Sequence, residues 1–329
     1  MTGLRIRPAT PADAGTVARF SRALMANDED GEPILFGAAH FISNGFGPYR
    51  AFDTLIAERN GQPVGHALYH PEYNTDLMQR SLRLLDLQVA TSARRAGVGR
   101  ALMGAVASAG AAAGATMMTW AVGRRDEVGR LLYRGVGHEQ PELFFGVVAE
   151  REMIALAETR PSIGFHLRLA GTEDVPILAG FIADLLRATD GEPPATIEAS
   201  LRRDGFGASP AFAAIIAADE AGPLGHALFW PAYDIGHAMR GSFLSDLYVA
   251  PRGRRRGVGL GLMGAVARRT RDQQGHYILW EILESNTAAI AFYARFARES
   301  RGGMPCFAAG EDFRTLQSWA PAVEADAGR

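Results

Sequence analysis

Two short segments rich in glycine and arginine carry the residue types best suited to holding an anion. Each follows an apolar stretch typical of a strand and stands where a helix is expected to begin. Backbone N–H groups at a helix N-terminus point at one spot, and the helix dipole favours an anion there. Glycine allows close backbone approach and arginine adds charge-assisted donors, so each segment predicts a pyrophosphate site. The segments are Arg94-Arg95-Ala96-Gly97-Val98-Gly99 and Arg254-Arg255-Arg256-Gly257-Val258-Gly259.

Two other interpretations of these segments are weaker. A solvated basic loop at a helix start explains one such segment, but less well a second one in the same register. The C-terminal segment also contains the dinucleotide fingerprint G-x-G-x-x-G, at Gly259, Gly261 and Gly264. The N-terminal copy has Ala101 in place of the second glycine, and residues 250–256 stand where that fingerprint requires a tight turn. Dinucleotide binding is therefore disfavoured.

The two segments belong to a duplication of the whole chain. Asp86 matches Asp246 and Trp120 matches Trp280, each pair separated by 160 positions (246 − 86 and 280 − 120). A period of this length gives each copy enough chain for a core of its own. We therefore predict two domains, with proline and glycine marking the junction. The predicted division is an N-terminal domain 1–158, a linker 159–164 and a C-terminal domain 165–329.

Each copy has the same predicted order of elements. A short strand is followed by helices, an antiparallel hairpin, and then a strand–helix–strand–helix unit. This order predicts an α/β (α+β mixed-sheet) fold, mostly antiparallel, with a parallel strand–helix–strand core and helices on both faces. In the C-terminal copy the strands are expected at 166–169, 211–217, 225–230, 242–249 and 277–282, and in the N-terminal copy at 55–58, 64–69, 82–89 and 116–122.

The bulk composition limits the classes of protein that fit. Apolar residues make up 47% and charged residues 21%, as in soluble globular proteins. No apolar run reaches the roughly 18–20 residues of a membrane span, and the start lacks a secretory signal pattern. Cys306 is the only cysteine, which excludes an intrachain disulfide and a multi-cysteine metal site. We expect a cytoplasmic protein without a metal, and the net charge of −2 argues against nucleic-acid binding.

The R-x-x-G-x-G pattern between a strand and a helix resembles the acetyl-CoA pyrophosphate loop of the GNAT N-acetyltransferase superfamily. In the C-terminal copy, Asn286 and Tyr293 follow at the places of the family's asparagine-to-tyrosine segment. Each copy is similar, over nearly its whole length, to spermidine/spermine (diamine) N-acetyltransferases. The motifs that carry this similarity are Asp204-Gly205-Phe206-Gly207, Ser245-Asp246-Leu247-Tyr248-Val249 and Phe292-Tyr293-Ala294-Arg295, with counterparts at Asn44-Gly45-Phe46-Gly47, Leu85-Asp86-Leu87 and Leu132-Tyr133-Arg134-Gly135.

The resemblance implies a role for each motif, with acetyl-CoA as the co-substrate. The two glycine loops would hold its pyrophosphate, and Asn286 would lie on the helix beside its arm. A bulge in the strand of Asp246 would open the sheet for the coenzyme. Tyr293 and Tyr133 would protonate the leaving thiolate, with buried packing tyrosines as the alternative. The backbone amides expected to meet the pantetheine arm are those of Leu247, Tyr248 and Val249, and of Leu87, Gln88 and Val89.

The acceptor that the resemblance implies is the primary amine of a small cation, polyamine or lysine-like. Its free base costs about 4 kcal/mol to present at pH 7, from roughly three pK units at about 1.36 each. Carboxylates could attract the ammonium group, although those in the repeated DGEP sequence also suit a turn. Asp86 and Asp246, within apolar strands, are either substrate contacts or structural hydrogen-bond acceptors. The DGEP carboxylates are Asp30, Glu32, Asp190 and Glu192.

One departure from the polyamine enzymes keeps other functions open. Where they carry glutamate before the strand aspartate, this chain has Ser245 and Leu85. An acyl-CoA sensor or structural module with degenerate sites is therefore an alternative, and a protein N-acetyltransferase is another. Polyamine-type relatives work as homodimers, so the two copies could form a pseudo-dimer within one chain, or two chains could pair. The expected partner is a small-molecule amine, with no nucleic acid and no membrane.

Overall fold

The computed structural model describes residues 3–25, 35–159, 164–189 and 191–321. The N-terminal half, up to residue 159, contains β1 (Leu4–Pro8), α1 (Ala14–Met25), α2 (Ala38–Gly45), β2 (Asp53–Arg59), β3 (Gln62–Asn74), β4 (Gln79–Val89), α3 (Val98–Ala112), β5 (Met117–Gly123), α4 (Glu127–Leu132), β6 (His138–Glu139), β7 (Leu143–Ala149) and α5 (Glu150–Glu158). The C-terminal half, from residue 164, contains β8 (His166–Leu169), α6 (Val175–Ala188), α7 (Ile197–Gly205), β9 (Ala213–Asp219), β10 (Gly222–Asp234), β11 (Met239–Val249), α8 (Val258–Asp272), β12 (Tyr277–Leu283), α9 (Thr287–Tyr293), β13 (Arg298–Ser300), β14 (Gly303–Ala309) and α10 (Gly310–Gln317).

The first helix of each half is fixed to its first strand by the same local device. Asp13 accepts a backbone hydrogen bond from Thr10 at 2.7 Å and is bound by both Nη atoms of Arg7 at 2.8 Å. Asp174 is bound in the same bidentate way by Arg168, at 2.6 and 2.7 Å. Each aspartate accepts the backbone N–H three residues earlier, as the acid of a capping box, and opposes the positive end of the helix dipole. The sequence therefore sets the position of α1 and α6 locally.

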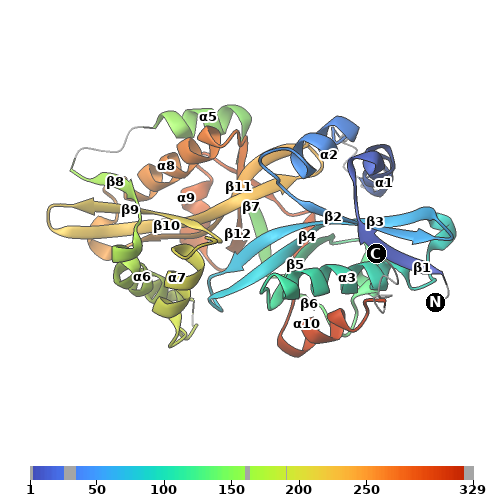
Figure 1. Ribbon diagram of the computed structural model, residues 1–329. Helices are drawn as coiled ribbons and strands as arrows, with labels where there is room; N and C mark the ends of the chain where they lie inside the picture. The colour runs from blue at the N-terminus through green and yellow to red at the C-terminus, as the bar shows by residue number, and fades with distance from the viewer. Residues whose placement is uncertain (1–2, 26–34, 160–163, 190, 322–329) are drawn as a thin grey trace.

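Each half forms most of a seven-stranded mixed sheet, and the other half completes it. The strand orders are β1-β2-β3-β4-β5-β14-β6 and β13-β7-β12-β11-β10-β9-β8. β14 lies antiparallel to β5, with Cys306 opposite Trp120, and β7 lies antiparallel to β12, with Gly146 opposite Trp280. The helices that follow these strands cross over as well, since α10 packs on α3 and α5 on α8. Figure 1 shows β7, in green, among the yellow and orange strands of the C-terminal half.

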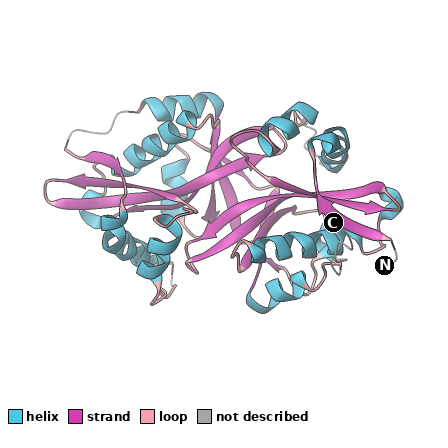
Figure 2. Cartoon of the chain, viewed as in Figure 1, coloured by secondary structure: helices cyan, strands magenta, loops and turns pink. Residues whose placement is uncertain are grey.

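The exchange means that the sheets do not follow the linear order of the chain. The division at 1–158, 159–164 and 165–329 stays a prediction about the sequence, and residues 160–163 of its linker lie outside the described part of the chain. In space, each sheet contains strands from both sides of that boundary. The predicted fold class is confirmed: among the strands that the structure describes, only β4–β5 and β11–β12 pair in parallel, and helices cover both faces of each sheet (Figure 2).

The two halves also interlock through their long hairpins. Tyr73 and Met78 of the β3–β4 hairpin enter the core between the C-terminal sheet and α6–α7. Tyr233 and Ile235 of the β10–β11 hairpin enter the corresponding N-terminal core. Tyr233 accepts a hydrogen bond from Asn44 at 3.2 Å. Residues from one half therefore stand beside the α1–α2 or α6–α7 face of the other.

Within the described residues, no helix combines the length and apolar character that crossing a bilayer requires.

Candidate active site

The two glycine loops have the backbone geometry of an anion cradle. Gly97 and Gly257 precede α3 and α8 with φ of 80° and 81°, in the left-handed region that favours glycine. Two residues earlier, Arg95 and Arg255 also have positive φ, 58° and 60°. The first intrahelical hydrogen bond of α3 is from Ala101 N to Gly97 O, so the amides before it point out of the helix end. Both halves therefore present converging N–H groups at a positive helix terminus.

The first arginine of each loop is tied to the end of the preceding strand. Arg94 Nε donates to Val89 O and Arg254 Nε donates to Val249 O, both at 3.2 Å. A guanidinium carries five donors, so this bond leaves others for an anion. The same hydrogen bond therefore ties the glycine loop to the end of the preceding strand in both halves.

The C-terminal loop has an additional clamp. Nη1 of Arg252 and Nη1 of Arg256 each lie 3.0 Å from Asp219 at the end of β9. Their hydrogen bonds hold the pKa of the Asp219 carboxyl below its usual range. The N-terminal half has Ala96 and Arg59 at the places of Arg256 and Asp219, so it cannot form this clamp. Arg256, which the sequence predicted to bind the coenzyme, therefore also stabilises the loop itself.

The two parallel strands of each sheet pair over a short distance and then diverge. β4 pairs with β5 over residues 81–84, and β11 pairs with β12 over residues 241–243, although both first strands continue for several residues. On the opposite edge, the register with the hairpin partner shifts at Leu85 and at Ser245, which are bulged out. The bulge predicted for the strand of Asp246 is therefore present, and the strand of Asp86 has one as well; each lies where its sheet begins to open.

The amides predicted to meet the pantetheine arm lie on these diverging stretches, at residues 87–89 and 247–249. In the N-terminal half, Val89 N donates to the side-chain Oε1 of Gln88 at 3.1 Å. In the C-terminal half, the residue equivalent to Gln88 is Tyr248, whose hydroxyl turns away to Asp184 Oδ2 at 3.2 Å. The N-terminal strand end therefore has an internal partner for an amide that would otherwise face the coenzyme.

Asn286 and its counterpart Asp126 both begin the helix that follows the second parallel strand. Asn286 Oδ1 accepts from Ala289 N at 3.0 Å, and Asp126 Oδ1 accepts from Gly129 N at 2.8 Å. Asparagine and aspartate are equally good N-caps, which explains why the duplicated position tolerates either. The contact of Asn286 with the coenzyme stays a prediction.

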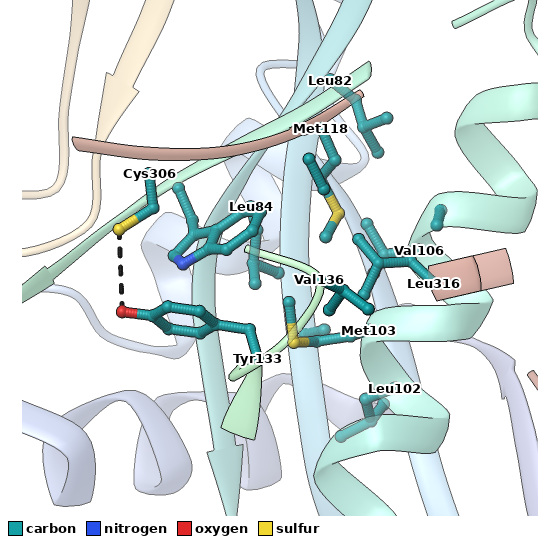
Figure 3. Packing of buried hydrophobic residues seen from close by; sticks show 14 of the residues in the cluster. Leu82, Leu84, Leu102, Met103, Val106, Met118, Tyr133, Val136, Cys306 and Leu316 are labelled. Atoms are coloured by element: carbon teal, nitrogen blue, oxygen red, sulfur yellow. Dashed lines mark hydrogen bonds between the residues drawn. The ribbon is translucent and has the colours of Figure 1, made fainter. Parts of the chain in front are cut away.

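Tyr133, at the end of α4, is enclosed by the strand that comes from the C-terminal half. The residue is only 3% exposed, and its ring meets Trp120 edge-on at 4.9 Å between centroids. Cys306 of β14 lies with its Sγ 3.6 Å from the Tyr133 hydroxyl, as Figure 3 shows. Burial raises the pKa of the Tyr133 hydroxyl well above its usual value. The hydroxyl thus already has a partner inside the core.

Tyr293, at the equivalent end of α9, has open space beside it. It is half-buried, lies tilted over Trp280 at 4.6 Å between centroids, and adjoins a pocket of about 120 Å³. Gly146 of β7 and Ile282 of β12 line this pocket together with residues of α9 and β13. Burial raises the pKa of the Tyr293 hydroxyl, so it stays protonated at neutral pH, as an acid must.

The surroundings of the two tyrosines differ because, at two pairs of equivalent positions, one half has glycine where the other has a larger residue. A Cβ at Gly146 would lie 2.4 Å from the Trp280 indole, and a Cβ at Gly137 would lie 2.7 Å from the Trp120 indole. The equivalent of Gly146 is Cys306, and the equivalent of Gly137 is Ala297. The Trp120 indole therefore leans over Gly137 of its own half, whereas the Trp280 indole leans over Gly146 from the other half, and a pocket adjoins Tyr293 there.

The strand aspartates are buried and face the first helix of their half. Asp86 Oδ2 accepts from Ser21 at 2.6 Å and lies 3.0 Å from His66 Nε2. These contacts favour the structural alternative for Asp86. Asp246 Oδ1 accepts from Ser245 at 3.0 Å and from Thr75 of the N-terminal half at 2.8 Å. The aspartate of the C-terminal half is thus positioned by a residue from the other half.

Two acidic residues were not predicted from the sequence as site residues: Asp76, which the charge of Asp246 influences, and Glu281, which the charge of Asp76 influences. Asp76 is exposed in the β3–β4 turn of the N-terminal half, yet partial loss of hydration and the charge of Asp246 raise its pKa to about 6. Glu281 on β12 has a pKa raised to about 7, mainly by burial, with Asp76 and Glu72 adding to the increase. Comparison of the two copies could have drawn attention to them, because each is acidic in one copy and uncharged in the other. The equivalents of Glu281 and Asp76 are Ala121 and Gly236.

The remaining predicted carboxylates are placed only in part. Asp30, Glu32 and Asp190 lie outside the described residues, and Glu192 is exposed between α6 and α7. In the part of the chain that the structure describes, no group of three or more histidine, cysteine, aspartate or glutamate side chains could hold a metal ion.

Comparison with protein families finds the acetyltransferase (GNAT) family twice, at residues 23–138 and 181–297. No curated protein matches the sequence. Among solved structures, a GCN5-related N-acetyltransferase from Sphaerobacter thermophilus is similar at 15% identity and a TM-score of 0.52, covering 99% of this chain and 98% of that one. A Drosophila protein is similar at 14% identity and a TM-score of 0.51, covering 93% and 99%. A tandem GNAT protein from the clavulanic acid biosynthesis pathway has 17% identity and a TM-score of 0.48, covering 92% and 97%.

Proposed function

Because the chain belongs to the acetyltransferase (GNAT) family and is an N-acetyltransferase, we propose that its C-terminal half acetylates the primary amine of a small cationic molecule. The acetyl donor is acetyl-CoA, and the acceptor is a polyamine or a lysine-like amine. Tyr293 protonates the thiolate that leaves. The N-terminal half keeps the coenzyme cradle but does not turn over.

The observation that carries this proposal is the difference between the two tyrosines. Tyr293 adjoins a pocket of about 120 Å³ beside Gly146. Tyr133 is fully enclosed, with the Cys306 thiol against its hydroxyl. A general acid must reach the atom that it protonates, by direct contact or through one water. The environment of Tyr293 meets this condition, and that of Tyr133 does not.

The residues of the C-terminal half fit acetyl-CoA. The loop of residues 254–259 has the N–H groups, the helix end and the arginines that a pyrophosphate needs. The diverging edge of β11 at residues 247–249 supplies backbone groups for the pantetheine arm. Bound acetyl-CoA supplies the activated acetyl group, and the protein's part is to hold the amine against the thioester.

Charge supports a cationic acceptor at this half. The charge of Asp246 raises the pKa of Asp76, and the charge of Asp76 in turn adds to the raised pKa of Glu281. Of these three, the N-terminal half keeps only the counterpart of Asp246, which is Asp86. A site with several carboxylates attracts an ammonium group and disfavours anionic acceptors.

For the N-terminal half we propose acyl-CoA binding without catalysis. Its cradle has the same φ values as the C-terminal one, and this favours retention of the coenzyme. The Cys306–Tyr133 contact and the internal partner of the Val89 amide fill the places where reaction would occur. This half would then act as a structural or sensing module.

We also propose that one chain suffices for activity, since the strand exchange that completes each sheet is internal. A cytoplasmic location suits a chain whose single thiol, Cys306, is buried and free.

The proposal is tested by measuring CoA release across a panel of diamines, lysine analogues and peptides, with Tyr293→Phe and Tyr133→Phe as matched variants. We expect Tyr293→Phe to lower turnover by about tenfold or more, because an acid contributes about 10²–10⁴-fold. Tyr133→Phe should stay within about twofold, since it is remote from the working site. Turnover on peptides alone would select a protein N-acetyltransferase instead. Equal losses in both variants would contradict the assignment of the working half.

A further inference from the structure

The pocket beside Tyr293 has more room than an acetyl group fills. Its volume is about 120 Å³. A methyl group is about the size of a water molecule, whose share of liquid volume is about 30 Å³, so the acetyl methyl would leave most of the pocket empty. A cavity of about 150 Å³ can hold a benzene molecule, so a group of several carbon atoms fits here. The lining around Tyr293 is apolar and consists of Gly146, Ile282, Ile290, Ala294 and Ala297.

The pocket lies where the chain of a bound acyl group would begin. Ile282 belongs to the core on the α8 side of the sheet, and Ile290 and Tyr293 pack against the same core. The proposed acid must reach the thioester sulfur, directly or through one water. The acyl carbon is bonded to that sulfur. A chain attached to the acyl carbon therefore starts close to Tyr293 and to the space that Tyr293 lines.

The charges around the pocket do not favour a cation in it. Glu299 lines the pocket, but Arg301 Nε donates to its Oε2 at 2.9 Å. Arg298 also lines the pocket and adds a positive charge. Asp246 points to the other side of the sheet, because its neighbour Leu247 packs on the α8 core and side chains alternate along a strand. An ammonium group is thus favoured on the α6 side, and an uncharged chain in the pocket.

In the N-terminal half, larger side chains occupy the equivalent place. Arg130 takes the position of Ile290. Its Nε and Nη2 lie 2.7 and 2.6 Å from the two carboxyl oxygens of Glu139, the equivalent of Glu299. The exchanged strand brings Cys306 there instead of a glycine. The open space is therefore a feature of the C-terminal half and not of the duplicated fold as such.

We propose that this space is the acyl pocket of the C-terminal half, and that it selects a donor whose acyl group is a short apolar chain longer than acetyl, such as butyryl-CoA. This inference rests on the proposed function, which places the thioester beside Tyr293. Acetyl-CoA stays a donor, but its acyl group leaves the acyl pocket largely unfilled.

A longer chain does not change the bonds that form and break. The nitrogen of the neutral amine attacks the thioester carbonyl carbon, so that a C–N bond forms and the C–S bond breaks. The sulfur takes the proton of the Tyr293 hydroxyl, and the proton that nitrogen loses returns to the tyrosine oxygen. The products are the N-acyl amine and CoA thiol. The acyl pocket adds only the burial of the chain, which favours binding by about fourfold per methylene group.

The test compares kcat/KM for acetyl-, propionyl-, butyryl-, octanoyl- and succinyl-CoA with one amine acceptor. We expect a rise of about tenfold from acetyl to butyryl, because the added methylene groups leave water. Octanoyl-CoA should be used less well than butyryl-CoA, since its chain exceeds the space. Succinyl-CoA should also be used less well, since its carboxylate would lose hydration. A butyryl-CoA value no higher than that for acetyl-CoA, or a preference for succinyl-CoA, would overturn the inference.

Two variants change the size of the acyl pocket in opposite directions. Ala297→Leu fills part of it and should remove the preference for butyryl-CoA over acetyl-CoA. Ile290→Ala enlarges it and should move the optimum to a longer chain. The readout is the ratio of kcat/KM for two donors in the same protein, so a partly unfolded sample does not alter it. Wild-type ratios in both variants would refute the assignment.

The matched control is Arg130→Ala, at the position of the N-terminal half that corresponds to Ile290. It removes the ion pair with Glu139 and should keep the wild-type ratio of butyryl-CoA to acetyl-CoA. A ratio that changes in Arg130→Ala but not in Ile290→Ala would contradict an acyl pocket in the C-terminal half.

The proposed function fails separately. A wild-type chain that releases CoA from neither acetyl-CoA nor butyryl-CoA with any acceptor, or a fully active Tyr293→Phe, would remove the proposed function. Turnover of acetyl-CoA that depends on Tyr293, without a gain for butyryl-CoA, would remove the acyl pocket alone.

Discussion

Tyr133 and Tyr293 end equivalent helices, yet their surroundings are decided by residues from the opposite half of the chain. β14 brings Cys306 to Tyr133, and β7 brings Gly146 to Tyr293. A change at either strand position acts on the tyrosine of the other half. Duplication followed by strand exchange therefore lets one copy lose its open site while the other keeps it.

The same comparison holds for charge. The hairpin of the N-terminal half brings Arg83, Glu72 and Asp76 to the C-terminal site. The hairpin of the C-terminal half brings Phe243, Ala232 and Gly236 at the equivalent positions. The N-terminal half thus supplies charged residues to the C-terminal site, whereas its own site receives uncharged residues from the C-terminal hairpin. Each difference can be tested by paired variants at equivalent positions.

The largest effect is expected at the cradle glycines. Gly257→Val places a β-branched residue at a φ of 81°, which is a strained conformation, and displaces the amides that would face the pyrophosphate. We expect CoA release to fall by about a hundredfold, which corresponds to about 2.7 kcal/mol. Gly97→Val imposes the same strain at a φ of 80°. It should change turnover by no more than about twofold, because distant sites act independently.

The control for these two variants is thermal unfolding. Both glycines occupy the same backbone conformation, so similar losses of stability are expected, and only the loss of turnover should differ. If Gly97→Val abolished CoA release while Gly257→Val left it normal, the working half would be the N-terminal one.

An intermediate effect is expected where the exchanged strands meet the tyrosines. A Cβ at Gly146 would lie 2.4 Å from the Trp280 indole, so Gly146→Cys must displace the ring on which Tyr293 packs and place a thiol in the pocket that Gly146 lines. We expect a loss of about tenfold in kcat, together with about 1–3 kcal/mol of stability from overpacking.

The matched variant is Cys306→Gly, measured in the same assays. It opens a small cavity beside Tyr133 and should cost about 1–2 kcal/mol of stability with turnover unchanged. Full activity in a folded Gly146→Cys chain would show that the space beside Tyr293 is not needed, and the contrast between the two halves would lose its main support.

The smallest effect is expected at the first helix of each half. Arg7 joins Asp13 and also Glu58, whereas Arg168 joins Asp174 and has Ala218 at the place of Glu58. The Arg7 hydrogen bond holds the pKa of Asp13 down to about 2. A depressed carboxyl pKa stabilises the fold above the unfolded pKa of about 3.9, and that contribution is lost as the pH falls toward 2.

We therefore expect Asp13→Asn to cost about 1–2 kcal/mol at pH 7, with the difference from wild type shrinking below pH 4. Asp174→Asn should cost less, because Arg168 is more exposed and has one acidic partner fewer. Urea unfolding at several pH values measures both. An Asp13→Asn cost that is independent of pH would contradict the electrostatic origin of the effect.

Much of the fold and of the coenzyme site could be predicted from local sequence. The glycine loops, the bulged strands and the tyrosines at the helix ends depend on residues close together in the chain, and duplication displayed each of them twice. Glu281 was not recognised as a site residue, because it gains its surroundings from residues about 200 positions earlier. The sequence predicts that its strand is buried. The alternation of side chains along that strand does not indicate which charged residues face Glu281.

What the sequence by itself determined is the set of local devices: the left-handed glycines that begin α3 and α8, the aspartates that fix α1 and α6, and the order of elements as far as α4 and α9. The strands and helices that follow, among them the exchanged β7 and β14, were not expected. The tertiary structure alone decided which half has an open site. That outcome depends on Cys306 and Gly146, each of which lies more than 100 positions from the tyrosine that it adjoins (306 − 133 and 293 − 146). Pairing between distant strands is set by the packing of the whole chain rather than by any nearby residue, so no local pattern records it.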